Sequence, residues 1–188
     1  VYKRSKLPPR YDEFVVGLEV KDREFSEEFG RRLANVVGRE PPIPRLNKHG
    51  RWVVEVQSKT LYELLKKPID IEKIRPYVEH CERCITMFLR GFFDSEGCVC
   101  KYGTISVANT DYRLLVYVTY LLNRIGIETT SDKPKLNQRA GTLCKNPRTG
   151  KIYKTRKDLY HVRVSRKSSL TFYTVSYTHL TLPTNREV

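Results

Sequence analysis

The sequence has no apolar run that approaches the roughly 20 residues of a membrane-spanning helix. It also has no signal-peptide pattern, so we expect a cytoplasmic protein. Neither GxxxxGKS/T nor GxGxxG occurs, so no nucleotide cofactor is expected. An RNP-type aromatic motif and a GXXG loop are missing as well, which disfavours two common RNA-binding modules.

Acidic residues are scarce relative to basic ones. The 188 residues include 35 Lys and Arg against 21 Asp and Glu, a formal net charge of +14. Residues 133–167 hold 12 basic residues and the single acid Asp158, whereas residues 69–97 hold four basic and six acidic residues. One charged run is often only a solvated face, but segregation on this scale favours nucleic acid as a partner.

Cysteine is limited to five residues, an odd number that argues against a disulfide framework. Cys81 and Cys84 precede a predicted helix, and Cys98 and Cys100 follow it. The two pairs are therefore about a helix length apart, too far to share one zinc ion. We expect these cysteines to be buried as small apolar side chains.

Two segments of the chain repeat the same order of predicted elements. Residues 14–20 form a strand-like apolar run, and residues 22–37 show the apolar spacing of a helix. Residues 104–107 and 111–125 repeat that strand and helix. This agreement indicates a duplicated αβ unit rather than a chance similarity.

The limits of the two predicted helices also correspond. Asp22 and Asp111 are suitable N-caps and lie 89 residues apart. The glycines expected to end the helices, Gly38 and Gly126, lie 88 residues apart.

An alternating strand follows each of these helices, in residues 51–65 and 159–173. Each strand is predicted to end in a lysine, Lys59 or Lys167, before an apolar helix start. The second copy has a basic insertion before its strand, at residues 133–157.

The helix that opens the second copy carries two carboxylates near its end. Its sequence LRGFFDSEG (Leu89–Gly97) resembles the nine-residue LAGLIDADG motif of homing endonucleases. The identical positions are Leu89, Gly91, Asp94 and Gly97, and the substituted ones are Arg90, Phe92, Phe93, Ser95 and Glu96. Arg90, in place of alanine, departs most from the motif.

The resemblance covers about residues 1–174 and implies an α+β fold. In that fold two αββαββα units are related by a pseudo-twofold axis, with antiparallel DNA-binding sheets and a central helix pair. Residues 1–78 would be the first repeat, whose motif helix is missing and is expected upstream of Val1, and residues 79–174 the second. We expect residues 175–188 to be a non-native read-through tail, because VSYTHL matches a common sequencing adapter read in one frame.

The resemblance further implies a site-specific double-strand DNA endonuclease that hydrolyses phosphodiester bonds with Mg²⁺ or another divalent metal. Glu96, at the eighth motif position, would be the catalytic metal ligand, and Asp94 would serve capping or packing. Gly91 and Ser95 are small and share a helical face, so they would pack the helix pair. The intact parent is expected to be a monomer, and this fragment to be inactive because one carboxylate is missing.

Basic residues at corresponding places in the two copies are the remaining candidates. Lys59 and Lys167 would lie near the scissile phosphates and act in catalysis. Gln57 suits adenine and Arg163 suits guanine. The residues expected to bind double-stranded DNA are Lys21, Arg45, Lys48, Arg51, Gln57, Arg139, Lys145, Arg148, Lys151, Lys154, Arg156, His161, Arg163 and Arg166.

Two other functions remain open from the sequence. The chain could be a cleavage-deficient relative acting as an RNA maturase or a DNA-binding protein, or an unrelated basic RNA-binding protein. The absence of splicing-type Cys, Ser or His-Asn ends favours an intron-borne or free-standing gene over an intein.

Overall fold

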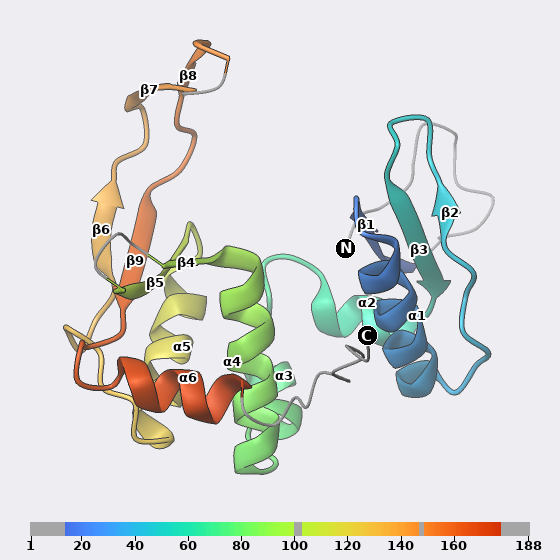
Figure 1. Cartoon of the computed structure of the whole chain (residues 1–188), viewed down its shortest axis with the longest axis horizontal. Helices are drawn as coiled ribbons and strands as arrows, with labels where there is room; N and C mark the ends of the chain where they lie inside the picture. The colour runs from blue at the N-terminus through green and yellow to red at the C-terminus, as the bar shows by residue number, and fades with distance from the viewer. Residues whose placement is uncertain (1–13, 100–102, 147–148, 178–188) are drawn as a thin grey trace, which may run out of the picture. The chain divides into compact units, whose positions relative to one another are not determined.

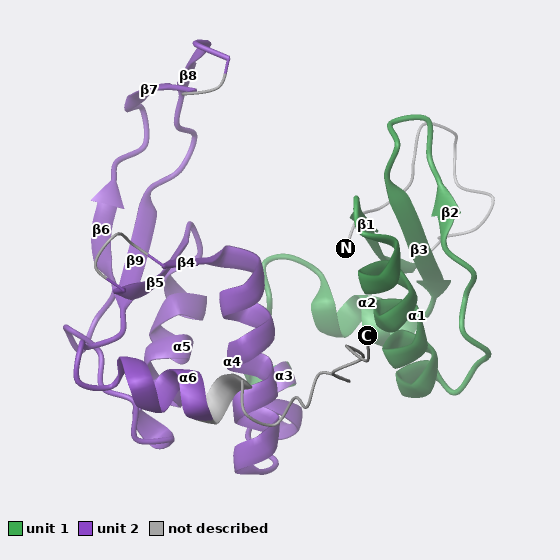
Figure 2. Ribbon diagram, viewed as in Figure 1, with its two compact units in different colours: residues 1–73 green, residues 74–188 purple. Residues whose placement is uncertain are grey.

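The computed structural model describes residues 14–99, 103–146 and 149–177 (Figure 1). Contacts within the chain divide it into two compact units, residues 1–73 and residues 74–188 (Figure 2). Helix α3 (Ile71–Val78) runs across this division. None of the described helices combines the length and apolar character that a bilayer span demands.

Unit 1 is a three-stranded antiparallel sheet, in the order β1-β3-β2, with α1 on one face. Its elements are β1 (Val15–Val20), α1 (Arg23–Val37), β2 (Arg45–Leu46), β3 (Trp52–Gln57) and α2 (Lys59–Leu65). Val56 is buried in a cluster with Leu33 of α1. Gly30 allows α1 to approach the sheet closely, because a Cβ there would lie 3.0 Å from Cγ2 of Val54.

Unit 2 has the element order αββαββα, with the hairpin β7–β8 inserted between β6 and β9. Its main sheet has the order β4-β5-β9-β6, and all its pairings are antiparallel. The elements are α4 (Glu82–Glu96), β4 (Gly97–Val99), β5 (Ile105–Asn109), α5 (Tyr112–Arg124), β6 (Lys135–Gln138), β7 (Leu143–Lys145), β8 (Ile152–Lys154), β9 (Leu159–Arg163) and α6 (Ser169–Tyr177). Of the tail expected at residues 175–188, residues 178–188 lie outside the described part of the chain.

The core of unit 2 lies between its main sheet and its helices, which gather at one end of the unit, away from the β7–β8 hairpin (Figure 1). Helix α5 is the most completely covered element. Its buried apolar side chains are Leu114, Leu115, Tyr117, Val118, Leu121 and Leu122. The sheet contributes Val107 and Val162 to the same core, and α6 contributes Phe172. A helix this apolar is held by its burial rather than by its own propensity.

The predicted helix limits are confirmed. Asp22 accepts a hydrogen bond from the backbone N of Phe25, and Asp111 accepts one from the backbone N of Leu114. Gly38 caps the end of α1 in the left-handed conformation, at φ 67°. Gly126, directly after the C-cap of α5, is also left-handed, at φ 76°.

The prediction that the cysteines are buried is wrong for those that the structure describes. Cys81 and Cys98 are exposed, and Cys84 and Cys144 are half-buried. Cys81 and Cys84 lie at the outer side of the first turn of α4, and Cys98 lies on the sheet face that the helices leave open. Cys100 lies outside the described residues.

We expect Asp111→Ala to lower the free energy of unfolding by about 1 kcal/mol, because it removes the side-chain acceptor that caps α5. Asp111→Asn keeps a side-chain acceptor, so its free energy of unfolding should fall much less. Asp132→Ala removes the same charge from an exposed loop and serves as the control. Urea denaturation followed by circular dichroism measures the three variants. Equal losses for Asp111→Ala and Asp132→Ala would contradict the assigned cap.

Candidate active site and nucleic-acid interface

Helix α4 passes into strand β4 without a loop, at Gly97. The backbone N of Gly97 donates to the carbonyl oxygen of Phe93, and a Cβ at position 97 would collide with that oxygen. Glycine at the last motif position is therefore required by close backbone approach. The turn fixes where the helix ends and hence where the preceding residue, Glu96, is presented.

The inner side of α4 holds the helix in the core of unit 2. Ile85, Leu89 and Phe93 are buried along it. The ring centroid of Phe93 lies 4.7 Å from that of Phe172 in α6. These contacts tie the motif helix to the last helix of the unit, so the direction of α4 follows from core packing.

The outer side of α4 carries the polar motif residues. Asp94, Ser95 and Glu96 are exposed. Nε of Arg90 lies 3.4 Å from Oδ2 of Asp94, which forms an i,i+4 ion pair along the helix. Arg90, the residue that departs most from the motif, therefore has a local partner in the motif's first acid.

Glu96 is the last residue of α4. It makes no hydrogen bond or ion pair with another residue of the described ranges 14–99, 103–146 and 149–177. A carboxylate at a helix C-terminus is disfavoured by about 0.3–1 kcal/mol because it faces the negative end of the helix dipole. Its exposed oxygens are open to an external cation.

Gly91 and Ser95 lie on the exposed side of α4. A Cβ at Gly91 would meet no atom within 4 Å, and the hydroxyl of Ser95 donates to the carbonyl oxygen of Phe92 at 3.0 Å. Both residues are small and uncharged on this side of the helix. Their expected packing against a second motif helix stays a prediction.

One face of the main sheet of unit 2 is left open by the helices. Val162 in β9 is buried toward the helices, so His161 and Arg163 lie on the opposite face. The strand register places Ser106 across from Arg163, and Lys135 across from His161. Lys135 is a candidate that the sequence reading did not single out, because only the pairing of β6 with β9 brings it beside His161.

His161 is electrostatically unusual on this open face. Burial lowers the pKa of its imidazole, and the positive charges of Arg163 and Lys135 lower it further. Its Nδ1 atom is buried and has no hydrogen-bond partner among the residues that the structure describes. The imidazole therefore resists protonation, and one of its ring nitrogens has no partner among the described residues.

The corresponding face of unit 1 is partly neutralised. Gln57 is exposed at the end of β3, on the face opposite to that covered by α1. On that same face Arg45 pairs with Glu55 at 2.6 Å. Arg51 lies 3.7 Å from Glu19. An incoming phosphate would have to compete with these carboxylates.

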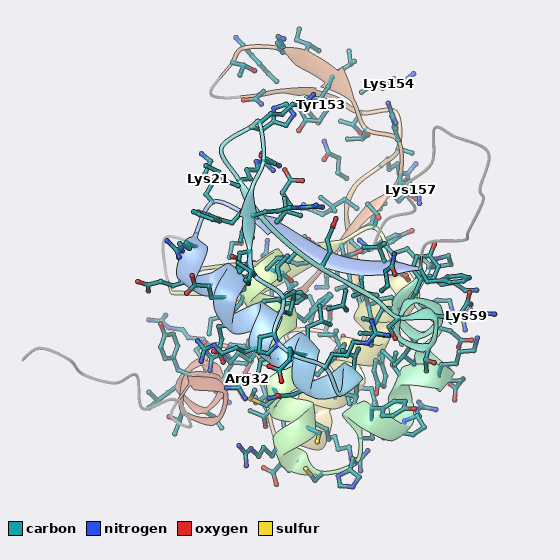
Figure 3. The ribbon with its side chains drawn as sticks, turned by 90° about the vertical axis from the view of Figure 1, so that its right-hand side faces the viewer. Lys21, Arg32, Lys59, Tyr153, Lys154 and Lys157 are labelled. Carbon is teal, nitrogen blue, oxygen red and sulfur yellow. The ribbon has the colours of Figure 1, made fainter. Side chains whose placement is uncertain are left out.

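Residues 133–157, here called the basic ribbon, begin with β6 at the edge of the main sheet and continue beyond that sheet as the β7–β8 hairpin (Figure 1). It contains no acidic residue. Its exposed candidates are Arg139, Lys145, Lys151, Lys154 and Arg156, while Arg148 lies outside the described residues. In Figure 3 the Lys154 side chain extends outward from the ribbon.

Asp158, the one acid of the basic segment, has a structural task at the base of the ribbon. Its Oδ1 accepts from the backbone N of Ala140 at 2.7 Å, and its Oδ2 accepts from the hydroxyl of Tyr160 at 3.3 Å. The carboxylate therefore joins the segments that follow β6 and precede β9, next to the irregularity in the β6–β9 pairing. The charged side chains of the basic ribbon are all positive.

The two candidate lysines lie beyond their strands rather than at the strand ends. Lys59 is the first residue of α2, because Ser58 caps that helix through a hydrogen bond from the backbone N of Leu61. Lys167 lies in the turn before α6. Both side chains are exposed, and Nζ of Lys59 lies 5.5 Å from the ring centroid of Phe14. Lys21, Lys48 and Arg166 are also exposed.

Comparison with known families matches residues 83–174 to the LAGLIDADG-like domain. The match includes the motif helix, the main sheet and the basic ribbon of unit 2. Unit 2 is a LAGLIDADG-like domain. The α+β fold with antiparallel sheets is also that of a solved homing endonuclease, I-DmoI in complex with DNA and Mn. That structure has a TM-score of 0.61 and 20% identity, covering 95% of this chain and 89% of that one.

Two curated proteins of Methanocaldococcus jannaschii are similar in sequence. Uncharacterized protein MJ0314 is 32% identical over 125 residues, 61% of this chain and 47% of that protein. Uncharacterized protein MJ0398 is 29% identical over 173 residues, 90% of this chain and 58% of that protein. The chain thus spans about half the length of the curated relatives it matches.

We expect Arg163→Gln and Lys135→Gln each to raise the pKa of His161 toward its ordinary value of 6.5, because each removes a nearby positive charge. The free energy of unfolding should fall as the pH drops through that value, since the unfolded chain then binds a proton that the folded chain resists. Titration of the imidazole by NMR measures the shift. Lys133→Gln removes the same charge and is the control, and an equal shift in that variant would contradict the assignment.

Proposed function

We propose that this LAGLIDADG-like chain belongs to a site-specific double-strand DNA endonuclease of the homing type that depends on a divalent metal. The observation that carries the proposal is Glu96, exposed at the end of the motif helix and without an ion pair to any residue that the structure describes. Strand β4 follows it directly and belongs to the sheet whose open face bears His161 and Arg163. An acid able to hold a cation thus adjoins a basic surface able to hold DNA.

The residues present fit a hard divalent cation. Glu96 offers carboxylate oxygens, which Mg²⁺ prefers, and Mg²⁺ completes its shell with phosphate oxygens, waters and few protein groups. I-DmoI is described in complexes with DNA and Mn, Mg or Ca. Mg²⁺ bound here would stabilise charge on the phosphate and lower the pKa of a bound water. A second carboxylate would come from a partner motif outside the described chain.

The protein's own groups would position the DNA backbone. Lys59 and Lys167 are exposed at the starts of α2 and α6, where their ammonium groups could contact phosphate without breaking an internal ion pair with another described residue. A lysine at a phosphate stabilises the negative charge that develops there during hydrolysis. We assign both lysines this role.

Recognition of the target would divide between the open sheet faces and the basic ribbon. A two-stranded ribbon can enter the major groove, where Arg pairs with guanine and Gln with adenine. Arg163 and Gln57 lie on the sheet faces opposite the helices, and we assign these contacts to them. The basic ribbon would follow phosphates, which supply affinity without sequence information.

We expect Glu96→Gln to reduce DNA cleavage by at least about 100-fold while leaving DNA affinity nearly unchanged, because a neutral amide is a poor metal ligand. The assay uses the complete reading frame and a plasmid library with randomised inserts, in Mg²⁺ or Mn²⁺. Sequencing of the linearised molecules identifies the cut site.

Asp94→Asn is the matched control, since it removes a carboxylate two residues away that is already paired with Arg90. It should keep most of the activity. Binding without cleavage by the unaltered protein would instead support a cleavage-deficient maturase or DNA-binding protein. Cleavage that survives Glu96→Gln would refute the proposed ligand.

Replacing Lys145, Lys151 and Lys154 together by Gln should weaken duplex binding uniformly across sequences. It should also reduce the slope of log affinity against log salt concentration by about 2–3, since each lost phosphate contact removes about 0.9. Fluorescence anisotropy with one duplex at several salt concentrations measures this. The control variant has the same net charge and carries Gln in place of Lys66, Lys67 and Lys73. An equal loss of duplex affinity in this control would show that net charge, rather than the basic ribbon, determines binding.

A further inference from the structure

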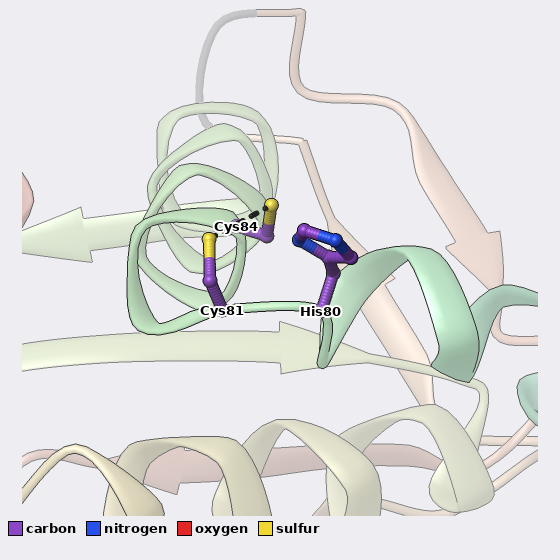
Figure 4. Close-up of side chains that lie close together, drawn as sticks. All are labelled: His80, Cys81 and Cys84. Carbon is purple, nitrogen blue, oxygen red and sulfur yellow. Dashed lines mark hydrogen bonds between the residues drawn. The ribbon is translucent and has the colours of Figure 1, made fainter.

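Three side chains that bind soft metals meet at the start of α4, at the opposite end of the helix from Glu96. They are His80, Cys81 and Cys84 (Figure 4). One ligand atom from each lies within 4.8 Å of the others. His80 and Cys81 are exposed and Cys84 is half-buried, so an ion could reach them from solvent.

The helix geometry explains why the two thiols meet. Cys81 is the N-cap of α4 and Cys84 is three residues later, the spacing at which a capping Ser or Thr and a Glu reach each other in a capping box. The sulfur atoms are 3.3 Å apart. The Cys81 side chain makes no capping hydrogen bond to a backbone N–H of the helix, although cysteine occupies a position that Ser, Thr, Asp or Asn normally fills. Its contact with Cys84 is therefore between the two thiols.

The backbone that presents His80 is fixed by its neighbour Glu79. Glu79 pairs with Arg75 at 2.9 Å, accepts from the hydroxyl of Tyr120 at 3.1 Å, and forms an ion pair with Arg124. These partners belong to α3 and α5. The junction between α3 and α4 is therefore anchored to the core before any ion binds.

We propose that His80, Cys81 and Cys84 form a binding site for one thiophilic divalent ion, Zn²⁺, with the fourth position open to water. Two Zn–S bonds of about 2.3 Å at the tetrahedral angle place the sulfurs about 3.8 Å apart, a small change from the observed spacing.

The site is chemically separate from the proposed catalytic metal. Thiolate and imidazole select zinc over Mg²⁺, whereas a carboxylate with phosphate selects Mg²⁺. The 15 residues of α4 also separate the two ends by roughly 20 Å at 1.5 Å per residue. Bound zinc would link the end of α3 to the first turn of α4 and stabilise the missing cap. The inference therefore does not depend on the proposed nuclease activity.

A Cys81–Cys84 disulfide is the competing state of this cluster. It would use both thiols but give the imidazole of His80 no role. The two states are distinguished by metal content and by free thiol count.

The test is a titration of the reduced, metal-free chain with Co²⁺, followed by displacement with Zn²⁺. We expect one equivalent of Co²⁺ to produce the thiolate-to-cobalt charge-transfer absorption and the intense visible bands of a tetrahedral ion. Zn²⁺ should abolish both and raise the melting temperature. His80→Ala, Cys81→Ser and Cys84→Ser should each weaken binding by at least about tenfold.

Two controls keep the result specific. The double variant Cys98→Ser, Cys144→Ser removes the other described cysteines and should bind Co²⁺ like the parent, and so should Glu96→Gln. No charge-transfer band in the reduced chain, or a band that survives Cys81→Ser and Cys84→Ser, would overturn the proposal. A Cys81–Cys84 disulfide that forms in air even with excess Zn²⁺ present would also overturn it.

Discussion

The burial of the inner side of α4 is the constraint on which the rest of unit 2 depends. Leu89 is completely buried and Phe93 nearly so. Phe93 contacts Phe172 of α6, the last helix of the unit along the chain. Side chains point in fixed directions from a helix. Burial of the inner side of α4 therefore also sets where the residues at its two ends and on its outer side lie. Gly97 then allows the chain to enter the sheet at once. The place of Glu96 is thus a consequence of apolar packing, although the Glu96 side chain is itself exposed.

The two units differ in how their basic side chains are paired. Acidic residues form ion pairs with Arg45 and Arg51 in unit 1, whereas the basic ribbon of unit 2 contains no acidic residue. Asp158 binds backbone and tyrosine at the base of the basic ribbon, so it does not neutralise the lysines beyond it. In unit 1 Glu55 and Glu19 lie beside Arg45 and Arg51. Surface ion pairs of this kind contribute roughly 0–1 kcal/mol, so a phosphate can replace the carboxylate at little cost. The ion pairs of unit 1 would therefore cost the proposed phosphate contacts of that face little.

The positions of the helices and strands could be predicted from the sequence, because caps and apolar spacing depend on residues that are neighbours in the chain. Asp22 and Asp111 cap their helices as the sequence suggested, and β3 and β9 form within the segments predicted as alternating strands. Long-range pairing did not follow from local pattern. Lys135 became a neighbour of His161 only through the β6–β9 register. The cysteines were wrongly taken as buried because composition alone does not show which side of a helix turn a thiol occupies, and His80 was overlooked for the same reason.

The two ends of α4 differ in the hardness of their donors, and this has a consequence for how the proposed sites would act together. Oxygen at the C-terminal end discriminates for Mg²⁺, and sulfur and nitrogen at the N-terminal end discriminate for zinc, so neither ion competes for the other's place. Zinc at the first turn would hold the end of the helix that has no side-chain cap. The middle of α4 is buried and close-packed, so a restraint applied at the first turn would be passed along the helix toward Glu96. A structural ion at one end would in this way narrow the range of positions open to the acid at the other.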